Sequence, residues 1–148
     1  MSYKGRYKPK HPEKYLGDCS EITFRSLWER KVMIFFDDCP SIIKWSSEPF
    51  AIPYVSPLDN KVHKYYPDFY LKVKNREGSI IDHVVEIKPK YQSRMPKQSE
   101  GKSNRTFVNE AATYAVNEAK WTAARQACKV RNWNFAVWTE DEIFGKKK

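Results

Sequence analysis

The most constraining feature of this sequence is a mostly apolar run at positions 80–88, which carries two charged residues near its end. Its composition predicts a central β-strand. Strand alternation then places Val84, Glu86 and Lys88 on one face, with a carboxylate and an ammonium about 7 Å apart along a mostly buried strand. Buried charges are costly unless they are paired or bind a metal. The fold must therefore supply a partner for these charges.

A second carboxylate is expected beside them. A polar turn at residues 75–78 joins residues 65–73 to the charged strand as a predicted hairpin, in which Asp68 can lie across from the region of Glu86. Two carboxylates with a lysine on one face suit Mg²⁺ or Mn²⁺, which prefer oxygen ligands. In such a site the metal can generate hydroxide, while Lys88 orients it or stabilises developing charge. The alternative is a purely structural cluster of salt bridges.

The rest of the pattern predicts an α/β domain. Ser26 and Glu29 fit a capping box that begins a helix, and Pro40 ends this helix after about residue 38. The other predicted elements are strands at 42–46, 50–55 and 135–138, a long helix at 106–130 and a short helix at 140–144. Because the long helix joins two strands, the last strand pair is expected to be parallel. We therefore predict a mixed β-sheet flanked by helices.

The chain is expected to have three parts. Residues 1–18 are polar and basic and contain two prolines, and they predict a flexible or loosely docked arm. Residues 19–145 form the predicted domain, and residues 146–148 are a basic tail. Residues 89–104 lack periodicity and predict a long loop, a kind of segment that is often functional or disordered.

Charge and composition narrow the class of partner. There are 27 Lys and Arg against 18 Asp and Glu, a net charge of +9 that favours an anionic partner such as DNA. No apolar run approaches the roughly 20 residues of a membrane span, and no basic amphipathic helix is evident, so no membrane partner is expected. With five glycines and no glycine-rich phosphate loop, no nucleotide cofactor is expected. The three cysteines form no zinc pattern.

Basic residues after the charged strand are candidate DNA contacts. The loop carries a series of cations that could hold a DNA backbone, namely Lys90, Arg94, Lys97, Lys102 and Arg105. A solvated, disordered loop is the alternative. Lys120 interrupts an apolar stripe of the long helix, so it could touch a phosphate or simply extend its ammonium to solvent at the edge of the stripe.

Glu29 has two interpretations. It lies in line with Met33 and Phe36, so its carboxylate points inward and needs a partner. It also stands three residues after Ser26, where it could simply complete the capping box. The residue pattern alone leaves both open.

Several motifs resemble one nuclease superfamily. Tyr66-Pro67-Asp68-Phe69 followed by Val85-Glu86-Ile87-Lys88-Pro89 is similar to the core motif of the PD-(D/E)XK nucleases, and Trp28-Glu29-Arg30-Lys31 is similar to the first helix of its TnsA-like branch. Residues 25–31, 45–48 and 52–63 also resemble the head completion nucleases of T-even-type bacteriophages. This narrower resemblance covers residues 3–144.

The resemblance implies a restriction-endonuclease-like fold and a metal-dependent DNA endonuclease. It implies that Asp68, Glu86 and Glu29 hold Mg²⁺ or Mn²⁺, and that Lys88 assists the attacking water. For the phage family, the implied role is to process packaged DNA and complete the head before the neck and tail join. The implied partners are DNA and portal or neck proteins, in the host cytoplasm during phage assembly or associated with the virion.

Two other functions stay open from the sequence. One is a non-enzymatic virion protein that completes the head or portal and binds DNA with a retained nuclease fold. The other is a basic DNA-binding module whose acidic cluster is structural. The intact set of Asp68, Glu86 and Lys88 favours the enzyme over both, because a retired site need not keep all three.

Overall fold

A four-stranded mixed sheet forms the centre of the computed structural model, which describes residues 4–145. The predicted tail at 146–148 and residues 1–3 lie outside the described residues. The strand order is β3-β6-β7-β8. These strands are β3 (Ile42–Ser47), β6 (Phe69–Lys74), β7 (Ile80–Ile87) and β8 (Asn134–Trp138). The first three run antiparallel and β7–β8 is parallel, which confirms the predicted mixed sheet and its last pair.

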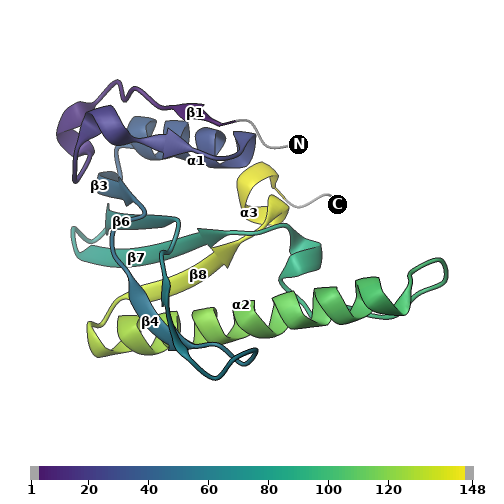
Figure 1. The fold of residues 1–148 in the computed structure, drawn as a ribbon. Helices are drawn as coiled ribbons and strands as arrows, with labels where there is room; N and C mark the ends of the chain where they lie inside the picture. The colour runs from purple at the N-terminus through teal and green to yellow at the C-terminus, as the bar shows by residue number, and fades with distance from the viewer. Residues whose placement is uncertain (1–3, 146–148) are drawn as a thin grey trace.

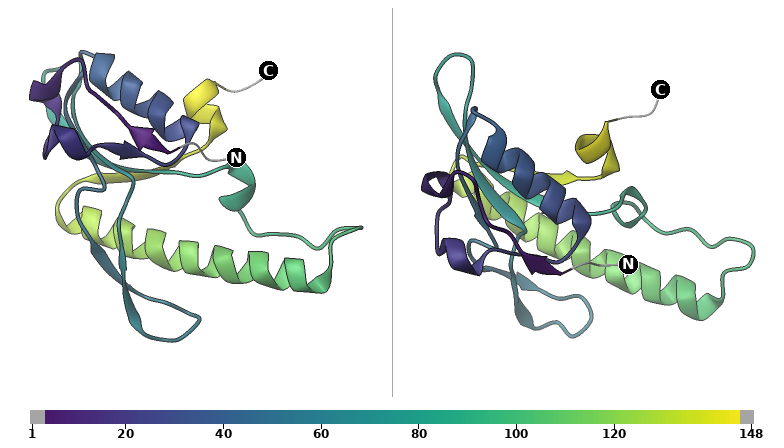
Figure 2. Two further views of the ribbon diagram at one scale, coloured as in Figure 1. Left: turned by 45° about the horizontal axis from the view of Figure 1, so that its top comes forward. Right: turned by 90° about the horizontal axis from the view of Figure 1, so that it is seen from above.

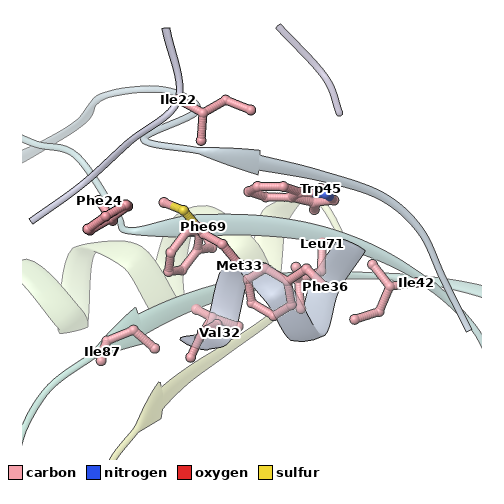
Figure 3. Close-up of a cluster of buried hydrophobic side chains, with 11 residues drawn as sticks. Ile22, Phe24, Val32, Met33, Phe36, Ile42, Trp45, Phe69, Leu71 and Ile87 are labelled. Carbon is pink, nitrogen blue, oxygen red and sulfur yellow. The ribbon is translucent and has the colours of Figure 1, made fainter. Parts of the chain in front are cut away.

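Helix α1 (Leu27–Asp38) covers one face of this sheet (Figure 1). The Ser26 hydroxyl accepts a hydrogen bond from the Glu29 N–H, as the capping pattern predicts. The helix buries its apolar stripe against side chains of β3, β6 and β7, and Figure 3 shows the resulting cluster. Its largest fully buried members are Trp45, Phe36 and Phe69. Burying an apolar side chain of this size contributes about 1.5–3 kcal/mol, so this cluster is a principal source of stability.

Helix α2 (Asn104–Val130) covers the opposite face with only its C-terminal half (Figure 1). Its buried residues begin at Asn117 and continue with Trp121, Ala124 and Cys128. The N-terminal half projects beyond the sheet together with the preceding loop, as both views in Figure 2 show. The predicted loop at 89–104 contains a helical turn, η3 (Lys90–Gln92), and α2 begins slightly earlier than predicted. Within residues 4–145 no helix has the length and apolarity to cross a membrane.

The strand predicted at 65–73 is wrong as a single element, because it is broken in two. Its first residue belongs to β5 (Val62–Tyr65), which pairs with β4 (Ile52–Val55) in a separate hairpin. Pro67 cannot donate a backbone hydrogen bond, so the ladder stops there and β6 begins two residues later. This break turns the chain at the point where Asp68 is placed.

Residues 4–18 of the N-terminal arm, predicted to be flexible or loosely docked, lie against the domain. Strand β1 (Gly5–Arg6) pairs with β2 (Thr23–Phe24), and two helical turns follow, η1 (Pro12–Lys14) and η2 (Cys19–Glu21). The buried Asp37 carboxylate accepts hydrogen bonds from this arm, including one from the Tyr7 hydroxyl at 2.8 Å. Lys14 Nζ donates to the carbonyl oxygens of three residues at the end of α1, Phe36, Asp37 and Cys39.

The N-terminal arm docks on the domain because it supplies polar partners that the end of α1 lacks. The last carbonyls of a helix have no partner within it, and a cation there also complements the helix dipole. The arm supplies that cation from Lys14, and it supplies donors for a carboxylate that is otherwise buried in the core.

Candidate active site

Asp68 and Glu86 meet where β6 begins and β7 ends. Phe69 pairs with Val85 in the ladder, so Asp68 comes directly across from Glu86. The Ile87 N–H donates to Asp68 Oδ2 at 2.8 Å, and the Asp68 N–H donates to Glu86 Oε1 at 3.3 Å. Each carboxylate is thus held by a backbone donor of the other strand. The predicted convergence of these two carboxylates on one sheet face is what the structure shows.

The electrostatics of this pair are unfavourable without a cation. Glu86 is buried, with 5% of its surface exposed. Burial first, and then the neighbouring Glu86 carboxylate, raise the pKa of Asp68 well above its usual range. The positive charge of Lys88 acts in the opposite direction on that pKa, so Lys88 lies close enough to interact. The positive charge of Lys88 does not fully offset burial and the charge of Glu86, because the pKa of Asp68 stays raised.

Tyr65 is a site residue that the sequence interpretation missed. Its side chain is buried, and its hydroxyl has no hydrogen-bond partner among residues 4–145. Burial and then the Glu86 carboxylate raise the pKa of this phenol, which places it beside the acid pair. A continuous strand would place Tyr66 on the same face as Asp68, but Tyr66 is exposed. The alternation fails because the strand breaks at Pro67. The available signal was the proline itself, since it cannot continue a ladder and strand parity cannot be carried through it to Tyr65.

Lys120 lies at the wall of this site. Its ammonium is 5.9 Å from the ring centre of Tyr54 and 5.7 Å from that of Tyr65. Cations are attracted to the faces of aromatic rings, so these two tyrosines hold the lysine between α2 and the β4–β5 hairpin. The contact brings Lys120 next to the residue that borders Glu86. Its predicted contact with a phosphate stays a prediction.

Glu29 stands at the start of α1 and faces the same acid pair. Its carboxylate accepts a hydrogen bond from the Arg25 N–H, one residue before the Ser26 N–H that a complete capping box would use, so it still supports the start of the helix. Burial raises the pKa of Glu29, the Arg25 hydrogen bond lowers it, and the Asp68 carboxylate raises it further. The side chain is therefore both a capping group and a neighbour of Asp68. Its predicted role as a metal ligand stays a prediction.

The donor set fits one kind of ion. Within residues 4–145, no group of three or more His, Cys, Asp or Glu side chains is arranged to hold a metal ion. The two oxygen donors that do converge, Asp68 and Glu86, match the hard cation Mg²⁺, which is often bound through one or two carboxylates and keeps several waters. A divalent cation would also relieve the repulsion that raises the pKa of Asp68.

The predicted DNA-binding loop divides into paired and unpaired cations. Lys90 Nζ lies 2.8 Å from Asp141, and Lys102 Nζ lies 3.0 Å from Glu110. Within residues 4–145, Arg94, Lys97 and Arg105 take part in no ion pair. Surface ion pairs are weak, typically below about 1 kcal/mol, so a phosphate could compete for Lys90 and Lys102. The whole set remains a prediction as a DNA contact.

Comparison with known proteins agrees with this geometry. A family model described as TnsA-like endonuclease N terminal matches residues 39–140. The chain belongs to the TnsA-like endonuclease family. The match includes Asp68, Glu86, Lys88 and Lys120, whereas Glu29 lies before it. Membership in this nuclease family fits the restriction-endonuclease-like arrangement of a mixed sheet with its acid pair at the strand ends.

A curated relative covers almost the whole chain. The head completion nuclease of Enterobacteria phage T4 is 35% identical over 146 residues, which are 97% of this chain and 95% of that protein. The alignment therefore extends to α1 and the docked arm, outside the family match. The resemblance to the head completion nucleases of T-even-type bacteriophages is confirmed.

Proposed function

We propose that this protein is a Mg²⁺- or Mn²⁺-dependent DNA endonuclease that processes phage DNA during completion of the head. The single observation that carries the proposal is the buried pair of Asp68 and Glu86, held across the end of the sheet with Lys88 beside it. Two buried carboxylates in contact are costly for a protein that only binds DNA. They are useful to an enzyme that binds a cation there.

In this proposal Asp68 and Glu86 hold the metal ion. When bound, the ion supplies a Lewis acid for the phosphate and lowers the pKa of a coordinated water. The backbone donors from Ile87 and Asp68 fix both carboxylates before the substrate arrives. Lys88 places positive charge where the scissile phosphate gains negative charge. Lys120, held by its two tyrosines, positions a neighbouring phosphate.

The net charge of +9 suits a polyanionic substrate. Arg94, Lys97 and Arg105 take part in no ion pair among residues 4–145. They lie on the loop before α2 and on the projecting end of α2, where they would contact the DNA backbone. We recognise no base-reading module in this domain, so we propose recognition of DNA ends or branches. The relative's name, head completion nuclease, supports a role on the assembling head. As partners we propose portal or neck proteins, in the host cytoplasm or the virion.

The test is incubation of the purified protein with linear, nicked and branched DNA, with Mg²⁺ or with EDTA. We expect cleavage only with Mg²⁺, and faster cleavage of ends or branches than of intact duplex. Lys88→Met should abolish cleavage while DNA affinity changes little, because one of many cations is lost. Cleavage that persists in EDTA would contradict the proposed metal dependence.

A further inference from the structure

A hollow lies between η3 and the projecting half of α2, and its lining ends on α2 one helical turn before Lys120. Its volume is about 330 Å³, near the lower limit of pockets that hold small molecules. A DNA duplex cannot enter a space of this size, whereas one nucleotide unit can. The first residue of its lining, Tyr91, comes three residues after Lys88, because η3 follows the end of β7 almost directly. In Figure 1 this helical turn lies between β7 and α2.

The lining of the hollow combines flat aromatic groups with amide groups. Tyr91 and Tyr114 contribute phenol rings from opposite sides, one from η3 and one from α2. Asn109 and Asn117 contribute amides, each of which can donate and accept hydrogen bonds. Nucleobases present a flat face for stacking and an edge with both donors and acceptors. The lining therefore matches the chemistry of a base on both counts.

Asn117 is the most specific of these observations. Its side chain is almost fully buried, with 6% of the residue exposed, and it lines the hollow. None of the hydrogen bonds found among residues 4–145 involves its amide. The amide is not among the fully buried side-chain atoms without a partner in the described residues, so it keeps access to the hollow and is available to a ligand there. One helical turn further along α2 lies Lys120, which is at the wall of the proposed active site.

The charges at the rim suit a nucleotide as well. Arg94 lines the hollow and takes part in no ion pair within the described residues, so it is available for the phosphate of the same nucleotide. Glu110 also lines the hollow, but its carboxylate is paired with Lys102 at 3.0 Å. The local charge is therefore not repulsive to an anion.

We propose that this hollow is a subsite for one unpaired nucleobase of the DNA substrate, next to the phosphate that is cut. This inference rests on the proposed function, and it adds a selection for DNA with a single-stranded overhang or a frayed end. A fully paired base cannot reach the hollow without leaving its stack, at an energetic cost that an unpaired base avoids. Tyr91 and Tyr114 stack on the base, and Asn117 bonds to its edge.

The test uses DNA duplexes with a short overhang that carries the fluorescent base 2-aminopurine, in EDTA so that no strand is cut. Binding to the wild type should change the fluorescence, because stacking on tyrosine alters the emission of this base. Tyr114→Leu should remove the fluorescence change and raise the Kd for overhang DNA about tenfold, within the range measured for loss of one base–aromatic stack. Its Kd for blunt duplex should change by less than twofold.

Two further variants complete the design. Tyr91→Leu gives a second test of stacking at an exposed position, where loss of the ring does not endanger folding. Phe35→Leu is the matched control, because it removes an exposed aromatic ring from α1 on the opposite face of the sheet. The control should bind both DNA forms like the wild type.

The outcomes separate this inference from the proposed function. If both tyrosine variants bind overhang DNA like the wild type, or lose affinity equally for overhang and blunt DNA, the base subsite is contradicted. Mg²⁺-dependent cleavage without any fluorescence change would contradict the subsite and leave the proposed function standing. A fluorescence change that both tyrosine variants lose, in a protein that cuts no DNA, would support the subsite and contradict the proposed function.

Discussion

The position of Asp68 is set by the proline before it and determines the electrostatics of the acid pair. Pro67 ends the backbone ladder just before it, so its carboxylate turns toward the end of β7 and accepts the Ile87 N–H. That position places it against Glu86 and raises its pKa. Without a metal ion, the two carboxylates repel each other, and the folded state bears the cost.

Asp68→Asn should therefore stabilise the metal-free protein while removing its response to metal. Because the pKa of Asp68 is raised by folding, the destabilisation is present at neutral and alkaline pH and is relieved as the pH falls toward the usual value for aspartate. In EDTA at pH 8 the variant should melt a few degrees above the wild type, where about 1 kcal/mol corresponds to 2–4 °C. Mg²⁺ should raise the Tm of the wild type only. A variant less stable than the wild type in EDTA would refute this account of the pair.

Glu29 allows its two roles to be separated. Glutamine can still accept the hydrogen bond from the Arg25 N–H, so Glu29→Gln should change the stability by less than about 1 kcal/mol. It should lower cleavage at least roughly tenfold, or raise the Mg²⁺ concentration required, because the negative charge near Asp68 is gone. Ser26→Ala is the matched control, since it weakens the same helix cap without touching the acid pair. If Glu29→Gln cuts DNA at the wild-type rate, Glu29 serves the cap alone.

At the scale of elements, α1 depends on a segment distant from it in sequence. Lys14→Met removes three hydrogen bonds of 2.7–2.9 Å to the carbonyl oxygens at the end of α1. Hydrogen bonds to a charged group contribute roughly 1.5–3 kcal/mol, so we expect a loss of about 2 kcal/mol in thermal or urea denaturation. The control is Lys10→Met, an exposed lysine of the same arm. Equal stability of the two variants would show that the arm does not support α1.

Local patterns in the sequence predicted most helices and strands, but they did not predict contacts between segments that are distant in the chain. The cap at Ser26, the turn at 75–78 and the long helix were predictable because each depends on neighbours in the chain. The acid pair was predictable because a hairpin fixes which residues face each other. The docking of Lys14 on α1 was not, since nothing near Lys14 in sequence reveals its partner.

In the candidate active site, too, local patterns were predictable from the sequence and tertiary contacts were not. Strand parity located Glu86 correctly, but it could not be continued through Pro67, and Tyr65 was therefore missed. The hollow beside η3 joins a loop to a helix that begins more than ten residues later, and no periodicity reports such a contact. The family match and the T4 relative support the nuclease class.

At the scale of the whole molecule, positive charge should dominate DNA affinity. Each phosphate contact that is lost should reduce the slope of log K against log salt concentration by about 0.9. Replacing Arg94, Lys97 and Arg105 together with glutamine should therefore reduce that slope by roughly 2–3. A triple glutamine variant of Lys4, Lys8 and Lys10, on the arm at the opposite face, should change it less. Equal slopes for the two variants would argue against the loop as the DNA contact.

The most direct test of the metal-dependent acid pair is the single-turnover rate of DNA cleavage by Glu86→Gln. Glutamine keeps the size of the side chain but removes the charge that a divalent cation requires. With Mg²⁺ the rate should fall at least roughly 100-fold, while DNA affinity stays within a few-fold of the wild type. Glu77→Gln, at the far turn of the β6–β7 hairpin, should cut normally. A folded Glu86→Gln protein that cuts DNA at the wild-type rate would contradict the proposed active site.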